Sequence, residues 1–432
     1  MVETQKHLLG LMLEIQAACK EKDIPLSLCG RSAAMAVQSK KFVTQCYEMH
    51  MMVPAGALPD LAKKLLKNRK KAIRMTRTRK LDRGIESWAE NPALPLNTVR
   101  YVDLNTTMID RDDPVYYTKP GAAVTIHPLY TQLPDEETDR RERGWFYYYG
   151  GKPFNYGTMV PENKEVLDAF LAEEDALDMQ KEAKKSFKLL KKQPPVGKAE
   201  TVYLRKQDGL LLELPATVIT ELKQIPFEEE TFSVPKDMNG YLLLQYGKKW
   251  KEKAFEPLKA SPNVNLIIDG FTPFQSYLEY FKKYDLDLME LKKKMQKFIF
   301  WKCMEFKPIE RKVNTEYLAS KRSADRIDIY CRLKPLIPQM QELAKNKEID
   351  RLGDMLSEYM EATERYYKKG LGFYINETLF DLADTVYKAR KRKTYMEKVR
   401  ALVPQIYLDE DVETFLRKRG YEVDEKTGEI RS

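Results

Sequence analysis

Two short stretches near the N-terminus carry the residues that are best suited to chemistry. The first is a Gly-x-Ser turn, Gly30 to Ser32, which follows a short apolar run and precedes a stretch of small residues. In the second, Glu48 and His50 lie two residues apart in an otherwise apolar run. Because alternate residues of a strand point to the same face, these two side chains would share one. Such a turn beside such a strand is typical of a phosphate and metal site.

The elements that must position these residues follow from the hydrophobic pattern. Helices are expected at 4–21 and 54–71, and strands at 26–28, 46–53, 99–104 and 123–129. Thr125 and His127 share a face of the last strand. A Gly-x-Ser turn beside a strand with two polar side chains is how nucleotidyltransferase-like folds build their site. The expected first domain is therefore α/β (α+β), with a mixed sheet and flanking helices.

The rest of the chain has mostly helical periodicity. A charged helical insert is expected at about 161–193, and a short helix follows the Val-Pro-Lys-Asp segment near residue 236. A Pro-marked linker at 259–262 precedes a Lys-rich helical tail. The pattern predicts two domains, 1–258 with the sheet and 263–432 as an all-helical C-terminal domain.

Composition is that of a globular, helix-rich protein. The 432 residues are 43% hydrophobic and 32% charged, with only 19 Gly. No run approaches the ~20 consecutive apolar residues of a membrane span, and the first residues lack the apolar core of a signal peptide. The five cysteines form no Cys-x-x-Cys pair. Reduced thiols in a cytoplasmic protein are expected.

The net charge of +9 is clustered. Lys63 to Arg83 holds eleven Lys or Arg and one acid, and a second basic cluster runs from Lys388 to Arg400. One interpretation is a solvated helix face or loop. The other is a surface for a polyanion, either a nucleotide diphosphate, a phosphodiester polymer or an anionic membrane face. Nucleic acid is not expected, because no recognisable nucleic-acid motif is present.

Three separated segments together resemble the LicD/fukutin family of phosphotransferases. Residues 28–37 correspond to that family's Leu-Asp-Gly-Gly-Thr-Leu-Leu-Gly-Ala-Val block, and residues 41–51 correspond to its aspartate-rich strand. The most specific match is 232–250, with Phe-x-Val-Pro-x-Asp followed by Tyr-Leu-x-x-x-Tyr-Gly. The order and spacing of the three segments also agree, and the resemblance covers about 1–258.

The resemblance implies a nucleotidyltransferase-like fold and transfer of a phospho-substituent, such as phosphocholine from a CDP-choline type of donor. The acceptor would be an anionic cell-surface glycan, for example teichoic acid or lipopolysaccharide, or its lipid-linked precursor. A divalent metal, normally magnesium, would neutralise the charge of the transition state. The enzyme would act from the cytoplasm, with peripheral contact at the inner face of the membrane through the basic segment.

The acidic positions of the family are rewritten in this chain. They fall on Cys46, Glu48, His50 and Thr125, so that only Glu48 is a carboxylate. Magnesium prefers oxygen ligands and would bind weakly here. One hypothesis is an inactive family member that binds a nucleotide-linked donor or acts as a scaffold. The other is a changed metal, since Glu48, His50 and His127 form a set that suits zinc, iron or manganese. Both histidines could also be merely structural.

The expected substrate-binding residues have structural alternatives as well. Arg31 replaces a glycine of the family turn between Gly30 and Ser32, and its guanidinium could hold a diphosphate or pair with the Glu48 carboxylate. Lys236 and Asp237 could close the pocket, but Asp is also a favoured helix cap. The aromatic run at 145–149 could form a choline cage, although such runs more often pack in cores.

Overall fold

The computed structural model divides the chain into two compact units, Met1–Ala324 and Asp325–Ser432. It describes residues 2–43, 46–75, 82–91, 94–115, 118–150, 159–173, 179–206, 210–255, 266–303, 307–329, 333–368, 377–390, 412–423 and 430–431. Helix α14 (Lys307–Asp328) runs across the division between the units. The linker expected at 259–262 lies outside the described residues. The two units divide some 60 residues later in the chain, so the first helices of the expected tail belong to the first unit.

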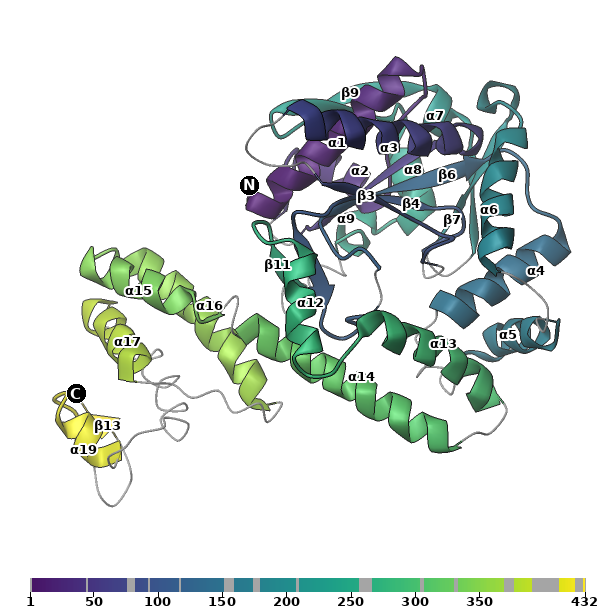
Figure 1. Ribbon diagram of the computed structural model, residues 1–432. Coiled ribbons are helices and arrows are strands. Elements are labelled where there is room, and N and C mark those ends of the chain that lie inside the picture. Colours follow the sequence, from purple (N-terminus) through teal and green to yellow (C-terminus); the bar gives the residue numbers. More distant parts are fainter. Residues whose placement is uncertain are drawn as a thin grey trace. The chain divides into compact units, whose positions relative to one another are not determined.

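A mixed seven-stranded sheet lies at the centre of the first unit (Figure 1). Its main path is β1-β2-β6-β4-β3, and β7 extends it by pairing with both β6 and β8. The β2–β6 pair is parallel, and the other pairs of this sheet are antiparallel. The strands are β1 (Ser27–Leu28), β2 (Glu48–Pro54), β3 (Arg83–Ser87), β4 (Val99–Asp103), β6 (Ala123–Tyr130), β7 (Thr201–Arg205) and β8 (Leu211–Pro215).

Helices α1 (Glu3–Glu21) and α3 (Leu58–Met75) pack against each other and against the sheet (Figure 1). The apolar stripe of α1 is completely buried, which confirms the helical periodicity of this segment, and it contains Leu8, Leu11, Met12 and Ile15. Helix α2 (Gly30–Gln38) packs against β2. Its small residues Ala33, Ala34 and Ala36 are buried and allow that close approach.

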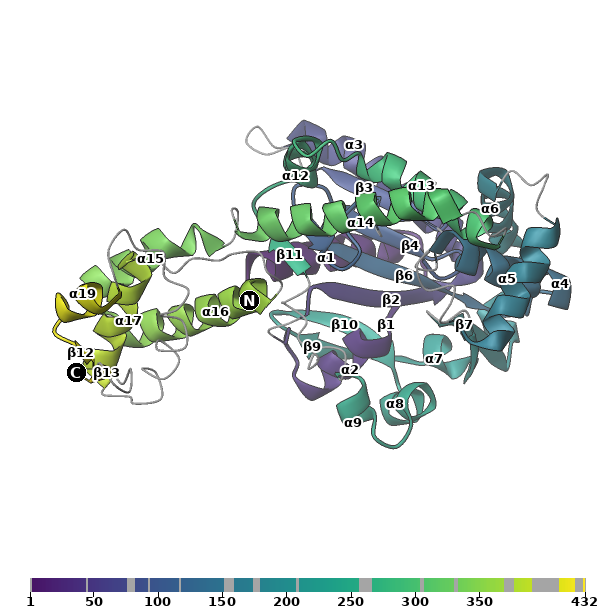
Figure 2. The same ribbon diagram turned by 90° about the horizontal axis from the view of Figure 1, so that it is seen from below.

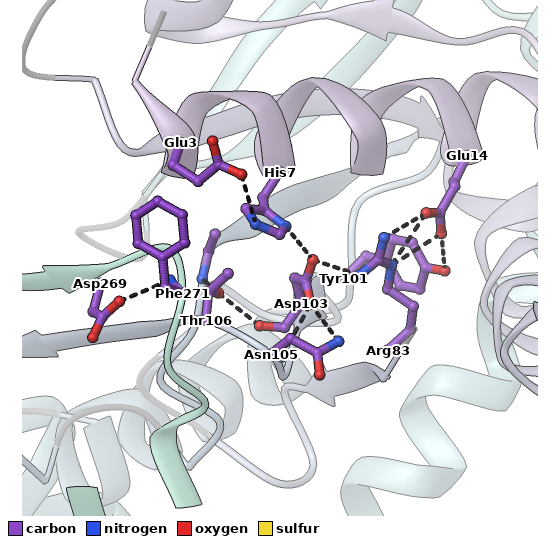
Figure 3. Close-up of polar contacts among 11 residues, drawn as sticks. Glu3, His7, Glu14, Arg83, Tyr101, Asp103, Asn105, Thr106, Asp269 and Phe271 are labelled. Atoms are coloured by element: carbon purple, nitrogen blue, oxygen red, sulfur yellow. Dashed lines mark hydrogen bonds and ion pairs between the residues drawn. The ribbon is translucent and has the colours of Figure 1, made fainter. Parts of the chain in front are cut away.

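A polar network fixes α1 to the end of β4 (Figure 3). His7 Nδ1 lies 2.7 Å from Asp103 Oδ2, and Arg83 Nη1 lies 2.5 Å from the same oxygen. Arg83 Nη2 also donates to Glu14 Oε1 at 2.8 Å, and the hydroxyl of Tyr101 donates to Glu14 Oε2 at 2.6 Å. The hydrogen bond to Asp103 raises the pKa of His7 above 6.5, against the opposing effect of burial. The network therefore holds the N-terminal helix by charge as well as by apolar packing.

A smaller layer lies beside β1 and α2 (Figure 2). It consists of the short helix α7 (Thr217–Thr220), the antiparallel hairpin β9 (Leu222–Phe227) and β10 (Glu230–Pro235), and helices α8 (Met238–Tyr246) and α9 (Trp250–Lys253). Asp237 caps α8, because its side chain accepts a hydrogen bond from Gly240 N at 2.9 Å. Helix α8 contacts α2 and so brings the third resembling segment to the first.

The remaining elements of the first unit flank this arrangement. The expected charged insert forms two helices, α5 (Pro161–Glu173) and α6 (Met179–Leu189), after α4 (Glu136–Trp145). Strand β5 (Thr107–Asp110) pairs with β11 (Leu266–Asp269), and α12 (Phe274–Lys282) and α13 (Leu288–Cys303) follow. Trp145 and Tyr147 are buried in a cluster with Trp88 and Phe170, so these two residues of the aromatic run pack in a core.

The second unit is built mainly from helices around an apolar core of its own. These are α15 (Leu336–Lys345), α16 (Ile349–Lys368), α17 (Glu377–Arg390) and α19 (Val412–Arg417), with a small pair of strands, β12 (Glu422–Val423) and β13 (Ile430–Arg431). The mixed α/β sheet with flanking helices and the helical C-terminal region confirm the expected fold class. Among the described residues, no helix is both long and apolar enough to cross a membrane.

Candidate functional site

A cavity of about 400 Å³ lies where β2 and β6 run side by side next to the start of α2. Six residues that the sequence singled out line it, namely Gly30, Arg31, Glu48, His50, Thr125 and His127. These residues come from three elements that are separated by up to about a hundred positions in the chain. Chain folding therefore gathers most of the candidate site at a single place.

The parallel register of β2 and β6 sets the arrangement of the polar side chains. His50 lies opposite Thr125, and His127 follows two residues later on β6. The Thr125 hydroxyl donates a hydrogen bond to Glu48 Oε1 at 2.7 Å. His50 Nδ1 lies 3.1 Å from His127 Nε2, which is hydrogen-bonding distance. The four groups thus form two interacting pairs on one face of the sheet.

The turn before α2 fixes the edge of the cavity. Gly30 has φ +54°, a left-handed conformation that strongly favours glycine. Its N–H donates to the Tyr241 hydroxyl at 2.9 Å, which ties the turn to α8. Ser32 is buried, and its hydroxyl accepts a hydrogen bond from His50 N at 2.7 Å. Ser32 therefore holds β2 against α2 and does not line the cavity.

Fixed positive charge lies beside and behind the cavity. Arg31 Nε donates to Ala254 O at 3.0 Å, which anchors the guanidinium at the cavity wall. Arg100 on β4 is completely buried, forms a short ion pair with buried Glu86, and places its Nε 3.8 Å from Glu48 Oε1. The Glu48 carboxylate thus faces Arg100, whereas the sequence had left open a pairing with Arg31.

These charges set the protonation states of the site. Burial alone would raise the pKa of Glu48, but His50, Arg100 and the Thr125 hydrogen bond outweigh it and lower this pKa. Burial, with smaller contributions from Arg31 and Arg100, lowers the pKa of His50 against the opposing effect of Glu48. Burial and the adjacent His50 lower the pKa of His127 to about 3. At neutral pH the site therefore holds one carboxylate and two uncharged imidazoles.

The sequence did not single out two further cations of the cavity wall, Arg205 and Lys206. Arg205 is the last residue of β7 and is buried, with its Nη2 2.8 Å from Asp139 Oδ1 and 3.6 Å from Glu142 Oε2. Burial raises the pKa of Glu142 to about 7. The available signal was a cationic pair directly after the alternating apolar residues of 201–205.

Two expected substrate-binding residues lie elsewhere. Lys236 and Asp237 line a different groove, beside α9, and not this cavity. Asp237 is the cap of α8, and Lys236 Nζ forms an exposed ion pair with Glu221 at 3.4 Å. Cys46 is buried, its thiol donates to Glu48 O at 3.2 Å, and burial raises its pKa to about 11. The cap explains Asp237 without any contact with a substrate.

Magnesium does not fit this donor set. It requires near-octahedral oxygen coordination, whereas the described residues that line the site include a single carboxylate, Glu48, whose Oε1 already accepts the Thr125 hydroxyl. Two neutral imidazoles complete the set. The described residues include no group of three or more His, Cys, Asp or Glu side chains placed to hold a metal ion. The zinc, iron or manganese alternative at Glu48, His50 and His127 stays a prediction.

The third resembling segment also reaches the cavity. Gln245 and Tyr246 of α8 line it, and the Tyr241 hydroxyl of the same helix accepts the hydrogen bond from Gly30 N. A methyl group at Gly30 would meet Gln245 Nε2 at 3.4 Å and the Tyr246 hydroxyl at 3.5 Å, so α8 closes this side.

Comparisons of the chain with protein-family models, with curated proteins and with solved structures found no match.

Proposed function

We propose that this protein transfers a phospho-substituent, such as phosphocholine from a CDP-linked donor, to a hydroxyl group of a cell-surface glycan or its lipid-linked precursor. One observation carries the proposal: all three segments of the LicD/fukutin resemblance contribute to one cavity. The turn contributes Gly30, β2 contributes Glu48 and His50, and α8 contributes Tyr246. Segments that merely resembled a family by chance would have no reason to converge in this way.

The charge of the cavity wall suits a phosphorylated donor. Arg31, Arg205 and Lys206 line it, and Glu48 is the one acidic side chain among the described residues that do so. Guanidinium groups bind phosphate oxygens with two parallel hydrogen bonds. The positive end of the α2 dipole adds to this preference, because the helix begins at Gly30. The volume of about 400 Å³ lies within the range of small-molecule sites.

The histidine pair can supply a general base. Each neutral imidazole carries one N–H, and one of these protons occupies the contact between His50 Nδ1 and His127 Nε2. Exactly one of the two outer nitrogens is then unprotonated and able to accept a proton. In the transfer step, the acceptor oxygen forms a bond to phosphorus and its proton passes to this nitrogen. The phosphoanhydride bond breaks, and the nucleoside monophosphate leaves with the bonding electrons.

A second function, binding of a nucleotide-linked donor without turnover, is favoured by the pairing within the site. The Glu48 carboxylate is occupied by the Thr125 hydroxyl and faces buried Arg100, while the two imidazoles bind each other. Groups that satisfy one another give a rigid binding surface that needs no catalysis. An inactive member of such a family would act as a donor-binding or scaffolding protein.

Two measurements on the full chain test these functions. The first is the unfolding temperature with CDP-choline and other nucleotide-linked compounds. The second is release of the nucleoside monophosphate in the presence of hydroxyl acceptors, followed by ³¹P NMR. The transferase predicts stabilisation together with release, and His50→Gln should slow release while leaving stabilisation in place. Lys236→Gln, in the other groove, should change neither and is the matched control.

Stabilisation without release from any donor would favour the binding function. If no nucleotide-linked compound stabilises the protein, both functions are contradicted. The two outcomes separate loss of chemistry from loss of the ligand site.

A further inference from the structure

We propose that this cavity binds the phosphate groups of its ligand through fixed protein cations, with no divalent metal ion. The inference rests on the proposed function, because it concerns the same ligand. It differs from the magnesium dependence that the family resemblance implies. Its basis is the chemistry of the groups that line and support the cavity.

Glu48, the single carboxylate among the described residues that line the cavity, already has partners within the protein. Glu48 Oε1 accepts the Thr125 hydroxyl at 2.7 Å and lies 3.8 Å from Nε of Arg100. Arg100 cannot move away easily, because it is completely buried and ion-paired with Glu86. A metal ion bound to Glu48 would lie close to the Arg100 guanidinium, and because Glu48 is only 30% exposed, water screens the repulsion between the two cations incompletely.

The cations that would replace the metal are held in place from behind. Arg31 uses its Nε to bind Ala254 O at 3.0 Å, and the rest of its guanidinium remains at the cavity wall. Arg205 is fixed by Asp139 at 2.8 Å. Lys206 follows directly and also lines the cavity. Prepositioned cations bind an anion without the cost of ordering flexible side chains.

The two imidazoles of the cavity lie beside the same fixed cations. Arg31 also lines the cavity beside His50, and Arg100 lies behind the adjacent Glu48. His50 and His127 point their nitrogens at each other at 3.1 Å. The cavity therefore has fixed cations, one compensated carboxylate and neutral rings, which together favour an anionic ligand over a metal cation.

Calorimetric titration of the full chain with CDP-choline tests this inference. The protein is stripped with EDTA and titrated in EDTA, then in buffers with Mg²⁺, Mn²⁺, Fe²⁺ or Zn²⁺. We expect the same dissociation constant in every buffer. Binding that appears only after a metal is added would overturn the inference and leave the proposed function standing. Absence of binding in every buffer would contradict both.

Glu48→Gln separates binding through protein cations from binding through a metal ion, because the two predict opposite changes in the affinity for CDP-choline. The amide keeps an oxygen for the Thr125 hydroxyl but removes the negative charge. A cation-based site should then bind CDP-choline in EDTA at least as tightly as the native protein, because repulsion of the phosphates is lost. A metal site, titrated in the metal-containing buffers, would lose its carboxylate ligand and bind CDP-choline more weakly than the native protein. Weaker binding by this variant would refute the inference.

Arg31→Gln should weaken binding in EDTA by roughly 10- to 100-fold, the loss expected for hydrogen bonds to a charged group. Arg31→Lys keeps the charge without the two-pronged geometry and should recover part of the affinity. The matched control is Lys236→Gln, which removes an exposed lysine outside the cavity. Unchanged affinity in both Arg31 variants, with unfolding temperatures like that of the native protein, would also overturn the proposal.

Discussion

Replacement of Arg100 by methionine is the most informative perturbation of the buried charge network. Arg100 and Glu86 have completely buried side chains and form a short ion pair. Glu86 Oε1 also accepts hydrogen bonds from Thr118 N and Thr118 Oγ1, both at 2.6 Å. Asn91 Nδ2 and Lys119 N donate to the same oxygen at 3.2 and 3.4 Å. Methionine fills a similar volume but leaves the Glu86 carboxylate buried with neutral donors and more distant charge.

The expected loss in the free energy of unfolding is about 3–5 kcal/mol, the usual cost of breaking a buried ion pair by removing one partner. The Glu86→Gln/Arg100→Met double variant should lose less than Arg100→Met alone, because the completely buried Glu86 charge is removed together with its partner. The pH dependence has a defined sign. Burial raises the pKa of Glu86, but Arg100 and the Thr118 hydrogen bonds outweigh burial and lower it in the native protein. Without Arg100 this pKa rises, so the deficit of the single variant should shrink as pH falls toward 4.5.

Urea unfolding followed by tryptophan fluorescence reports on the first unit, which contains Arg100 and Glu86. All four tryptophans lie in the first unit, at Trp88, Trp145, Trp250 and Trp301. A loss below about 1 kcal/mol in the single variant would refute the reasoning, since that is the size of an exposed ion pair. A double variant that is less stable than Arg100→Met would refute it as well.

Three further predictions concern stability of the first unit and use the same urea assay. His7→Gln removes a group whose pKa is raised by Asp103. The native protein should therefore exceed the variant in free energy of unfolding by the full amount below pH 6.5, and this difference should decline as pH rises through the folded-state pKa of His7. A difference that does not vary with pH would contradict this. Gly144→Ala should cost about 1–3 kcal/mol, because its new methyl group would lie 2.5 Å from Cβ of Phe170; a neutral effect would show that α4 and α5 can separate freely. Gly10→Ala, inside α1 with no atom within 4 Å of the new methyl group, should stabilise by roughly 0.5–1 kcal/mol, and a loss would disprove the open space at that position.

Local patterns were sufficient for the elements that carry the site. The stripe of Leu8, Met12 and Ile15 predicted α1, and the alternation around Glu48 and His50 predicted β2 with both side chains on one face. Spacing also predicted that Thr125 and His127 would share a face of β6. Such predictions succeed because a strand or helix period depends only on neighbours in the chain.

Closeness in the sequence did not predict which other residues line the cavity. Lys236 and Asp237 lie within ten residues of Tyr246, yet they face another groove, because α8 turns its two ends toward different surfaces. Arg205 reaches the cavity through pairing of β7 with β6, in which Leu204 lies opposite Leu129. Nothing within 201–205 specifies that partner strand.

The sequence by itself determined the turn at Gly30 and the polar face of β2. Those features are local, since they depend on residue type and on the period of one element. Tertiary structure alone decided that Glu48 faces Arg100 and that His50 pairs with His127. Both contacts join different strands of the folded sheet: β2 and β6 are neighbours, and β4 lies on the other side of β6. The register of these strands selects which side chains meet. That register therefore decides which polar side chains lie beside Glu48 and His50, and no single segment of the sequence specifies it.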